Sequence, residues 1–302
     1  MGQPPRHSLR VLFCLLGLHA STTMAQPLSD QSLPNLDDRF TFNPQGKYQP
    51  RFTGLFDTNR NNRSGAGEVM APVFQNSQGI LFTDVRTGNS SQAVYLTSAG
   101  GGLRYFVRPN LIGSTYIFMN HQEDYRHGPE SAVTTGIEFL ADGYEARFNA
   151  QFPTTRARLL DPEHGSTALR ESVPLTSLSG EIGYDLPGTE NLGFGLRLYA
   201  GGFYRTANNV ESISGVQGRL QISRAGWFGV PGLKTSFAAR IRHQSDINYP
   251  IGAFLLRIEL PLVKYWKGMA ADTYNELTPI ERRMTERVRR PLSIHNGTRR
   301  IP

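Results

Sequence analysis

The sequence contains a single cysteine, Cys14. It lies in the first 25 residues, where Arg6 and Arg10 precede a short apolar core and small residues lead up to Ala25. This arrangement is typical of a secretory signal peptide, so we expect residues 1–25 to be removed after Ala25. The rest of the chain would then have no cysteine, which excludes disulfides, a thiolate nucleophile and cysteine-ligated metals.

Long apolar runs are also missing. No stretch reaches the roughly 18 residues that a membrane-spanning helix needs, and the apolar core of the first segment is too short to act as an anchor. Aromatic residues are plentiful, however, with 17 Phe, 12 Tyr and 2 Trp, which argues against a disordered chain. Together with 31 glycines and only 38% hydrophobic residues, this composition favours an all-β protein.

Acidic residues are too few to balance the basic ones only at the C-terminal end of the chain. The formal net charge is +7, and residues 264–302 hold nine basic and four acidic side chains. The middle of the chain is therefore near neutral. A basic tail on an exported protein points to an anionic surface or a carboxylate-lined cavity, and we expect no nucleic-acid partner.

The central region alternates apolar and polar residues with a period of two. From Tyr144 to Phe152, aromatic and alanine side chains share one face while Glu145, Arg147 and other polar residues share the opposite face. Nine residues of strict alternation are long enough for a tilted strand to cross a bilayer. The run before it, 132–139, repeats the pattern, and the short link 141–143 predicts a hairpin.

Further runs predict about twelve strands between residues 49 and 263. Regular runs are at 178–184, 194–200, 216–222, 237–242 and 254–262, and less regular ones are at 49–57, 66–75, 79–86, 92–107 and 110–119. A soluble β-sandwich would also alternate in this way. Charges of both signs at mid-strand, with aromatics near strand ends, favour instead a transmembrane antiparallel β-barrel with a polar interior. The side chains predicted to face the lumen are Glu138, Glu145, Arg147, Glu181, Arg197, Arg219, Arg240, Arg242, Arg257 and Glu259.

Link lengths predict the topology. The links near 119–130 and 152–174 are longer and polar, and such loops face outward in outer-membrane barrels. The turn at 141–143 is then periplasmic. An even number of strands places both ends of the barrel there, so we expect residues 26–48 to form a short periplasmic segment.

The basic tail, 264–302, contains a helix signal. Thr278 to Glu281 forms a capping box with proline at the first helical position, which predicts a helix from about 279 to 290, ended by Pro291. Ile280, Met284 and Val288 make one apolar stripe. Arginines occupy the remaining faces, namely Arg282, Arg283, Arg287, Arg289 and Arg290. Three readings stay open: a solvated periplasmic helix, a plug or threaded linker whose arginines meet Glu138, Glu145 and Glu181, or a segment that binds anionic lipid or cell wall.

Several strand segments, in order, resemble the β-domain of inverse autotransporters, the intimin and invasin type of translocation barrel. These segments are Ser77–Arg86, Ala99–Phe106, Pro109–Gly113, Thr135–Pro153, Glu181–Pro187 and Gly193–Tyr199. The resemblance covers roughly residues 50–263. It implies a twelve-stranded outer-membrane barrel of a Gram-negative cell envelope, with the following chain threaded through the pore to carry a passenger.

The expected function follows only in part from this resemblance. The 39 residues from Lys264 to Pro302 contain no Ig-like repeat, so we expect no passenger in this sequence. The chain would serve as a translocator or anchor; the alternatives are a small tail-gated pore or a structural interaction protein. The expected partners are outer-membrane lipid, the barrel-assembly machinery, and an unlinked surface protein or cell wall.

Catalytic and metal-binding patterns are weak. The seven histidines never fall at metal-ligand spacing, so we expect no metal and no cofactor. Ser245 and Asp246 stand close to His243, but side chains of adjacent strand residues point to opposite faces, and this trio cannot form a catalytic triad. We therefore expect no enzymatic activity.

Overall fold

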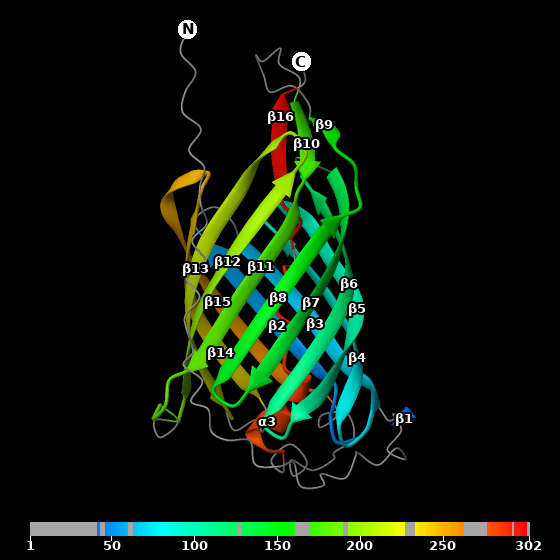
Figure 1. Cartoon of the computed structure of the whole chain (residues 1–302), viewed down its shortest axis with the longest axis vertical. Coiled ribbons are helices and arrows are strands. Elements are labelled where there is room, and N and C mark those ends of the chain that lie inside the picture. Colours follow the sequence, from blue (N-terminus) through cyan, green and yellow to red (C-terminus); the bar gives the residue numbers. More distant parts are fainter. Residues whose placement is uncertain are drawn as a thin grey trace, which may run out of the picture. The chain divides into compact units, whose positions relative to one another are not determined.

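In the computed structural model, twelve antiparallel strands close into one barrel (Figure 1). The structure describes residues 41–42, 46–59, 63–125, 128–160, 170–189, 193–226, 233–262, 277–291 and 293–300. The predicted signal peptide, most of the predicted segment 26–48, and residues 263–276 lie outside this description. The predicted fold class, an all-β antiparallel barrel of about twelve strands with a short C-terminal helix, is confirmed.

The barrel strands follow one another around the wall in sequence order. They are β2 (Arg51–Asn59), β3 (Arg63–Gln75), β4 (Gly79–Ser90), β5 (Ala93–Arg108), β6 (Leu111–Asp124), β7 (Gly128–Ala141), β8 (Tyr144–Pro153), β11 (Thr176–Asp185), β12 (Gly195–Ala207), β13 (Val210–Ala225), β14 (Lys234–Gln244) and β15 (Ile247–Pro261). The last strand pairs with the first, from Ala253 opposite Asn59 to Pro261 opposite Arg51. This pairing closes the ring, so every strand has a partner on both edges.

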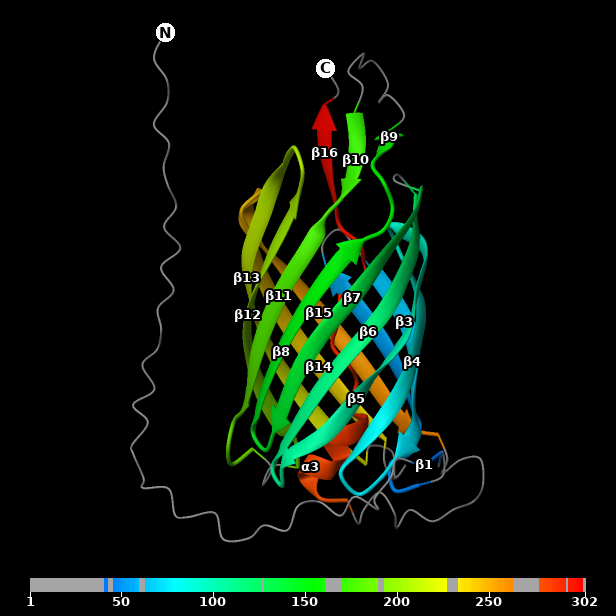
Figure 2. The ribbon, with the colours of Figure 1, turned by 45° about the vertical axis from the view of Figure 1, so that its right-hand side comes forward.

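Six short elements complete the description. They are β1 (Thr41–Phe42), β9 (Arg158–Leu160), β10 (Arg170–Pro174), the helical pair α3 (Pro279–Arg282) and η3 (Arg283–Thr285), and β16 (Asn296–Arg300). β9, β10 and β16 form a separate three-stranded sheet. In Figures 1 and 2, this sheet stands beyond one end of the barrel, and α3 lies at the other end.

The two-residue alternation of the sequence sorts side chains between the outer face and the interior. Ile117 and Phe254 are 62% and 70% exposed on the outside of the wall. Arg86, Arg104 and Arg147, in contrast, are completely buried. Because apolar side chains cover the outside and charged ones fill the inside, the wall has the surface distribution of a barrel embedded in lipid.

The links differ partly from prediction. The turn predicted at 141–143 is present, with Gly143 at φ +77° between β7 and β8. The long polar link predicted near 119–130 is wrong, because β6 continues to Asp124 and β7 begins at Gly128. Polar residues such as His121 continue the strand pairing there, opposite Ser131. Between residues 152 and 176 the link is long, as predicted, and it carries β9 and β10.

No helix within the described residues is long and apolar enough to cross a membrane.

Candidate functional site: the occupied lumen

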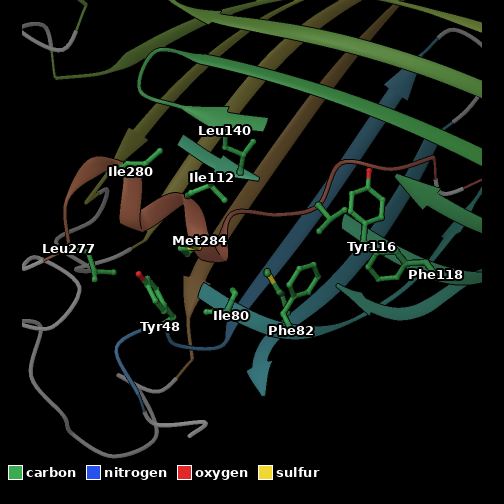
Figure 3. Packing of buried hydrophobic residues seen from close by; sticks show 12 residues of the cluster. Tyr48, Ile80, Phe82, Ile112, Tyr116, Phe118, Leu140, Leu277, Ile280 and Met284 are labelled. Atoms are coloured by element: carbon green, nitrogen blue, oxygen red, sulfur yellow. The ribbon is translucent and has the colours of Figure 1, made fainter. Parts of the chain in front are cut away.

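The tail begins at the end of the barrel where β2 starts and β15 ends. Its first described residues are held by an apolar cluster inside the mouth of the barrel (Figure 3). Ile280 and Met284 point into this cluster from α3 and η3. The cluster comprises Tyr48, Met70, Ile80, Phe82, Ile112, Tyr116, Phe118, Leu140, Leu277, Ile280, Met284 and Val288. The sequence predicted a polar interior, and this internal apolar patch is a correction, since it provides the surface that buries the stripe of the tail.

A polar contact ties the same end to the segment before β2. Lys47 Nζ contacts Glu281 Oε1, and the Thr278 backbone N–H donates to the other Glu281 oxygen at 2.8 Å. Burial alone would raise the pKa of Glu281, but these hydrogen bonds hold it below its ordinary value. Burial, followed by the charge of Glu281, raises the pKa of Tyr48 to about 12. The base of the tail therefore combines apolar packing with a charged contact.

The predicted helix 279–290 is wrong in length. The capping box forms, but α3 ends at Arg282, η3 ends at Thr285 and the backbone is extended at Glu286. Wall side chains bind the carbonyl groups that a longer helix would use internally. Arg104 donates to the carbonyl oxygens of Arg283 and Met284 at 3.3 and 2.9 Å. Since Arg104 satisfies these carbonyl groups without a further helical turn, the lumen stabilises a tail that leaves the helix here.

Further along, the extended tail is bound in the same manner. Arg86 donates to Val288 O at 3.2 Å, and Asn149 donates to Arg289 O at 3.3 Å. Gln122 binds both backbone groups of Ile294, accepting from its N–H at 2.9 Å and donating to its carbonyl at 3.0 Å. Four strands of the wall thus satisfy backbone groups of the tail.

The arginines of the tail meet carboxylates on several strands. Arg283 contacts Glu145 on β8, and Arg287 Nε lies 3.0 Å from Glu68 Oε2 on β3. Arg289 Nη1 lies 3.1 Å from Glu145 and 3.5 Å from Glu181 on β11. Arg290 Nη2 lies 2.9 Å from Asp84 on β4. Arg282, in contrast, donates to the Leu277 carbonyl at 3.1 Å.

Two of the three predicted carboxylate partners, Glu145 and Glu181, contact the tail. Glu138 pairs with no tail arginine whose side chain is described, and the wall residues Arg104 and Arg147 approach it at 2.7 and 3.5 Å. Sequence reasoning missed Glu68 and Asp84 as partners. The signal for Asp84 was the alternation in 79–86, which places it on the same face as Ile80, Phe82 and Arg86.

The other predicted lumen charges pair mostly within the wall. Arg197 contacts Asp185 and lies 2.8 Å from Glu145; Arg147 lies 3.4 Å from Glu145. Arg219 pairs with Glu181 at 2.6 Å, Arg240 with Asp57 at 2.9 Å, and Arg257 with Glu259 at 3.0 Å. Arg242 lies over the ring of Phe203 and has no ion pair to any described residue.

The tail reaches the far end of the barrel and pairs there with a loop strand. Leu175 N–H donates to the His295 carbonyl at 2.8 Å. β16 then runs antiparallel to β10, from Asn296 opposite Pro174 to Arg300 opposite Arg170. In Figure 2, β16 extends beyond the tips of the barrel strands. The described tail therefore passes through the whole lumen.

The described residues contain no group of three or more side chains that could hold a metal ion. Ser245 Oγ accepts a hydrogen bond from the backbone of Ser214, and Asp246 lies in the adjacent link between β14 and β15. The Ser245 hydroxyl is therefore bound to the backbone of β13, and this contact involves no histidine or carboxylate.

Among solved structures, a protein from a study of the in-meso crystallization of membrane proteins matches the barrel. It is 13% identical, with a TM-score of 0.64, and the match covers 83% of this chain and 99% of that one. An outer-membrane channel from Pseudomonas putida F1 is 10% identical over 70% of this chain and 94% of that one, with a TM-score of 0.46. The β-domain of the Bordetella autotransporter BrkA is 13% identical over 70% and 98%, with a TM-score of 0.39. No family model and no curated protein sequence matches the chain. At these identities, the first match establishes the fold alone, and the inverse-autotransporter resemblance stays a prediction.

Proposed function

We propose that the protein is an outer-membrane translocation barrel that passes its own C-terminal segment through the lumen and then anchors it there. One observation carries this proposal: the tail starts at the end that holds both barrel termini and pairs with β10 beyond the opposite end. A periplasmic helix or a simple lid would not need to extend that far. The apolar outer face supports contact with outer-membrane lipid, and a lipid-embedded barrel would rely on the barrel-assembly machinery for insertion.

The contacts along the tail favour anchoring as the final state. Apolar packing at the base, hydrogen bonds to the backbone at mid-lumen and strand pairing at the exit hold three successive stretches. The arginines reach β3, β4, β8 and β11, so the tail binds several strands of the wall. Such multiple contacts resist withdrawal of the tail and keep the emerging segment outside, where it would hold an unlinked surface protein.

The test is surface labelling of an epitope placed after Pro302. Intact cells that expose the epitope support passage through the lumen. Labelling that needs permeabilisation of the outer membrane contradicts the proposal and places the segment on the periplasmic side. The control is the same epitope in the turn at 142–143, which lies at the α3 end and should be labelled only after permeabilisation. Heat-modifiable migration in gels confirms in each case that the barrel is folded.

A tail-gated pore is the second candidate. The contacts that hold the tail in the lumen are noncovalent, so the tail can be displaced. Ion pairs and hydrogen bonds hold the mid-lumen stretch, such as Arg290 to Asp84 and Arg86 to Val288. Displacement of this stretch would open a passage lined with charged side chains. The conductance measurement described in the Discussion tests this candidate.

A further inference from the structure

Two arginines near the exit of the lumen have no described carboxylate within ion-pair distance. Arg205 on β12 and Arg242 on β14 form no ion pair with any described residue. Their neighbours on the same wall differ, since Arg219, Arg240 and Arg257 each pair with an acid. Arg205 is nonetheless only 7% exposed. An unpaired charge buried to this degree is unfavourable unless some other group compensates for it.

An aromatic ring fixes both guanidinium groups in one place. The central carbon of Arg205 lies 4.3 Å from the centroid of Phe203, and that of Arg242 lies 5.2 Å from the same centroid. Phe203 is itself buried and packs over Gly215, where a Cβ atom would stand 2.5 Å from the ring. The missing side chain at Gly215 therefore provides the space for the ring. The ring in turn orients the two cations, which are at most about 10 Å apart.

The hydrogen bonds of this pair are incomplete. The Nε atoms of both Arg205 and Arg242 are buried and have no hydrogen-bond acceptor within the described part of the chain. A guanidinium has five N–H donors in a fixed fork, so two such groups can surround an acceptor with several oxygens. Unsatisfied donors, like charges and a rigid support together characterise a site built for an anion.

The surrounding charges do not replace that anion. Asp57 is held by Arg240 at 2.9 Å, and Asp246, in the link after β14, makes no ion pair with Arg205. The third basic group nearby is His295 of the tail. Burial, and then the charges of Arg205 and Arg242, hold the pKa of His295 well below its ordinary value, so it stays neutral at pH 7. Asp246 attracts Arg205 and Asp57 attracts Arg242, but both lie beyond ion-pair distance, so the two positive charges remain only partly balanced.

We propose that Arg205, Arg242 and Phe203 form a binding site for a phosphate group at the outer end of the lumen. A phosphate carries up to two negative charges at neutral pH and presents several acceptor oxygens, which matches two arginine forks. The group could be free phosphate or a phosphate attached to an envelope glycolipid. The three residues of this site belong to the barrel wall, so the site goes beyond the proposed function.

The experiment is a calorimetric titration of inorganic phosphate into the purified full chain in detergent, at low ionic strength. The wild type should bind phosphate saturably, and added salt should weaken the binding. R205Q and R242Q should each raise the dissociation constant about tenfold or more, because each loses charge-assisted hydrogen bonds. The matched control is R219Q, which removes a lumen arginine from the intervening strand β13 whose carboxylate partner, Glu181, also contacts Arg289. It should leave phosphate affinity within about twofold of wild type.

Several results would overturn the proposal. They are the absence of saturable phosphate binding by the wild type, equal affinity of R205Q and R242Q with wild type, or the same loss in R219Q. If a variant fails to fold, the wild-type titration alone still tests whether the protein binds phosphate saturably. Vesicles that contain lipopolysaccharide, with and without enzymatic dephosphorylation, then distinguish the source. Competition by the phosphorylated form alone assigns a glycolipid phosphate, whereas competition by neither form assigns free phosphate.

Discussion

Glu145 connects the wall and the tail at the scale of single residues. Four guanidinium groups reach its carboxylate: Arg147 at 3.4 Å, Arg197 at 2.8 Å, Arg289 at 3.1 Å, and Arg283 in closer contact. Two of these arginines belong to strands and two to the tail. The carboxylate is almost completely buried, so water cannot compensate for its loss. Each arginine would then depend on the remaining acids nearby.

The substitution E145Q should destabilise the folded barrel. Removing one partner of a buried ion pair costs about 3–5 kcal/mol, and we expect the lower part of this range because Glu181 and Glu286 remain close to Arg289. The free energy of unfolding by urea in detergent measures the effect. The matched control is E211Q, at an exposed position on β13, which should change stability by less than about 0.5 kcal/mol. Equal losses in the two variants would contradict the assigned role of Glu145.

At the scale of elements, α3 secures the base of the tail by local and distant contacts. Thr278 and Glu281 complete the capping box, and Lys47 adds a contact from the segment before β2. Ile280 and Met284 anchor the same turn in the apolar cluster. The element is only a single turn followed by η3, so its stability depends on these contacts rather than on helix length.

The contribution of Glu281 should depend on pH. Its pKa in the folded protein is lower than its ordinary value, so the folded state takes up a proton less readily than the unfolded state. The stabilisation is complete above the unfolded pKa of about 4.3 and is lost as pH falls through the folded pKa. The difference in unfolding free energy between wild type and E281Q should thus be about 0.5–1 kcal/mol at pH 7 and approach zero in acid.

Thermal unfolding of both proteins between pH 3 and pH 7 measures this dependence. E211Q again serves as the control, since its exposed carboxylate should give a difference from wild type that stays near zero throughout. A difference for E281Q that stays constant with pH would rule out the charged contact with Lys47 as its source, since glutamine can still complete the capping box.

At the scale of the whole molecule, the tail is the internal core of the barrel. The wall closes through β15 and β2, but part of its inner surface is apolar and is covered by Leu277, Ile280, Met284 and Val288. Without the tail this surface would face water, and Glu68 and Asp84 would lose arginine partners. The tail therefore fills the lumen and also neutralises the carboxylates of Glu68 and Asp84.

Deletion of residues 277–302 should open the pore. In planar bilayers, we expect the truncated protein to show clear single-channel conductance while the full chain stays near the baseline, because the tail occupies the passage. Deletion of residues 296–302 alone is the control, as it removes β16 but keeps the stretch inside the lumen, and it should stay closed. Equal conductance of the full chain and the longer deletion would mean that wall side chains close the pore without the tail.

The sequence by itself determined the strands, their inward and outward faces, and the start of the tail helix. These features depend on neighbours within a few residues: alternation in Tyr144–Phe152 defines the two faces of β8, and Thr278 with Glu281 defines the first turn of α3. The tertiary structure alone decided where that helix ends, because Arg104 from β5 binds carbonyl groups of η3.

The tertiary structure also decided which charges form ion pairs. Asp84 and Arg290 are distant in sequence and meet only through the stagger of the closed wall. The unpaired state of Arg205 and Arg242 has the same origin. Their residue types were visible in the sequence, but the lack of a described acid at ion-pair distance depends on where β12 and β14 lie in the closed wall.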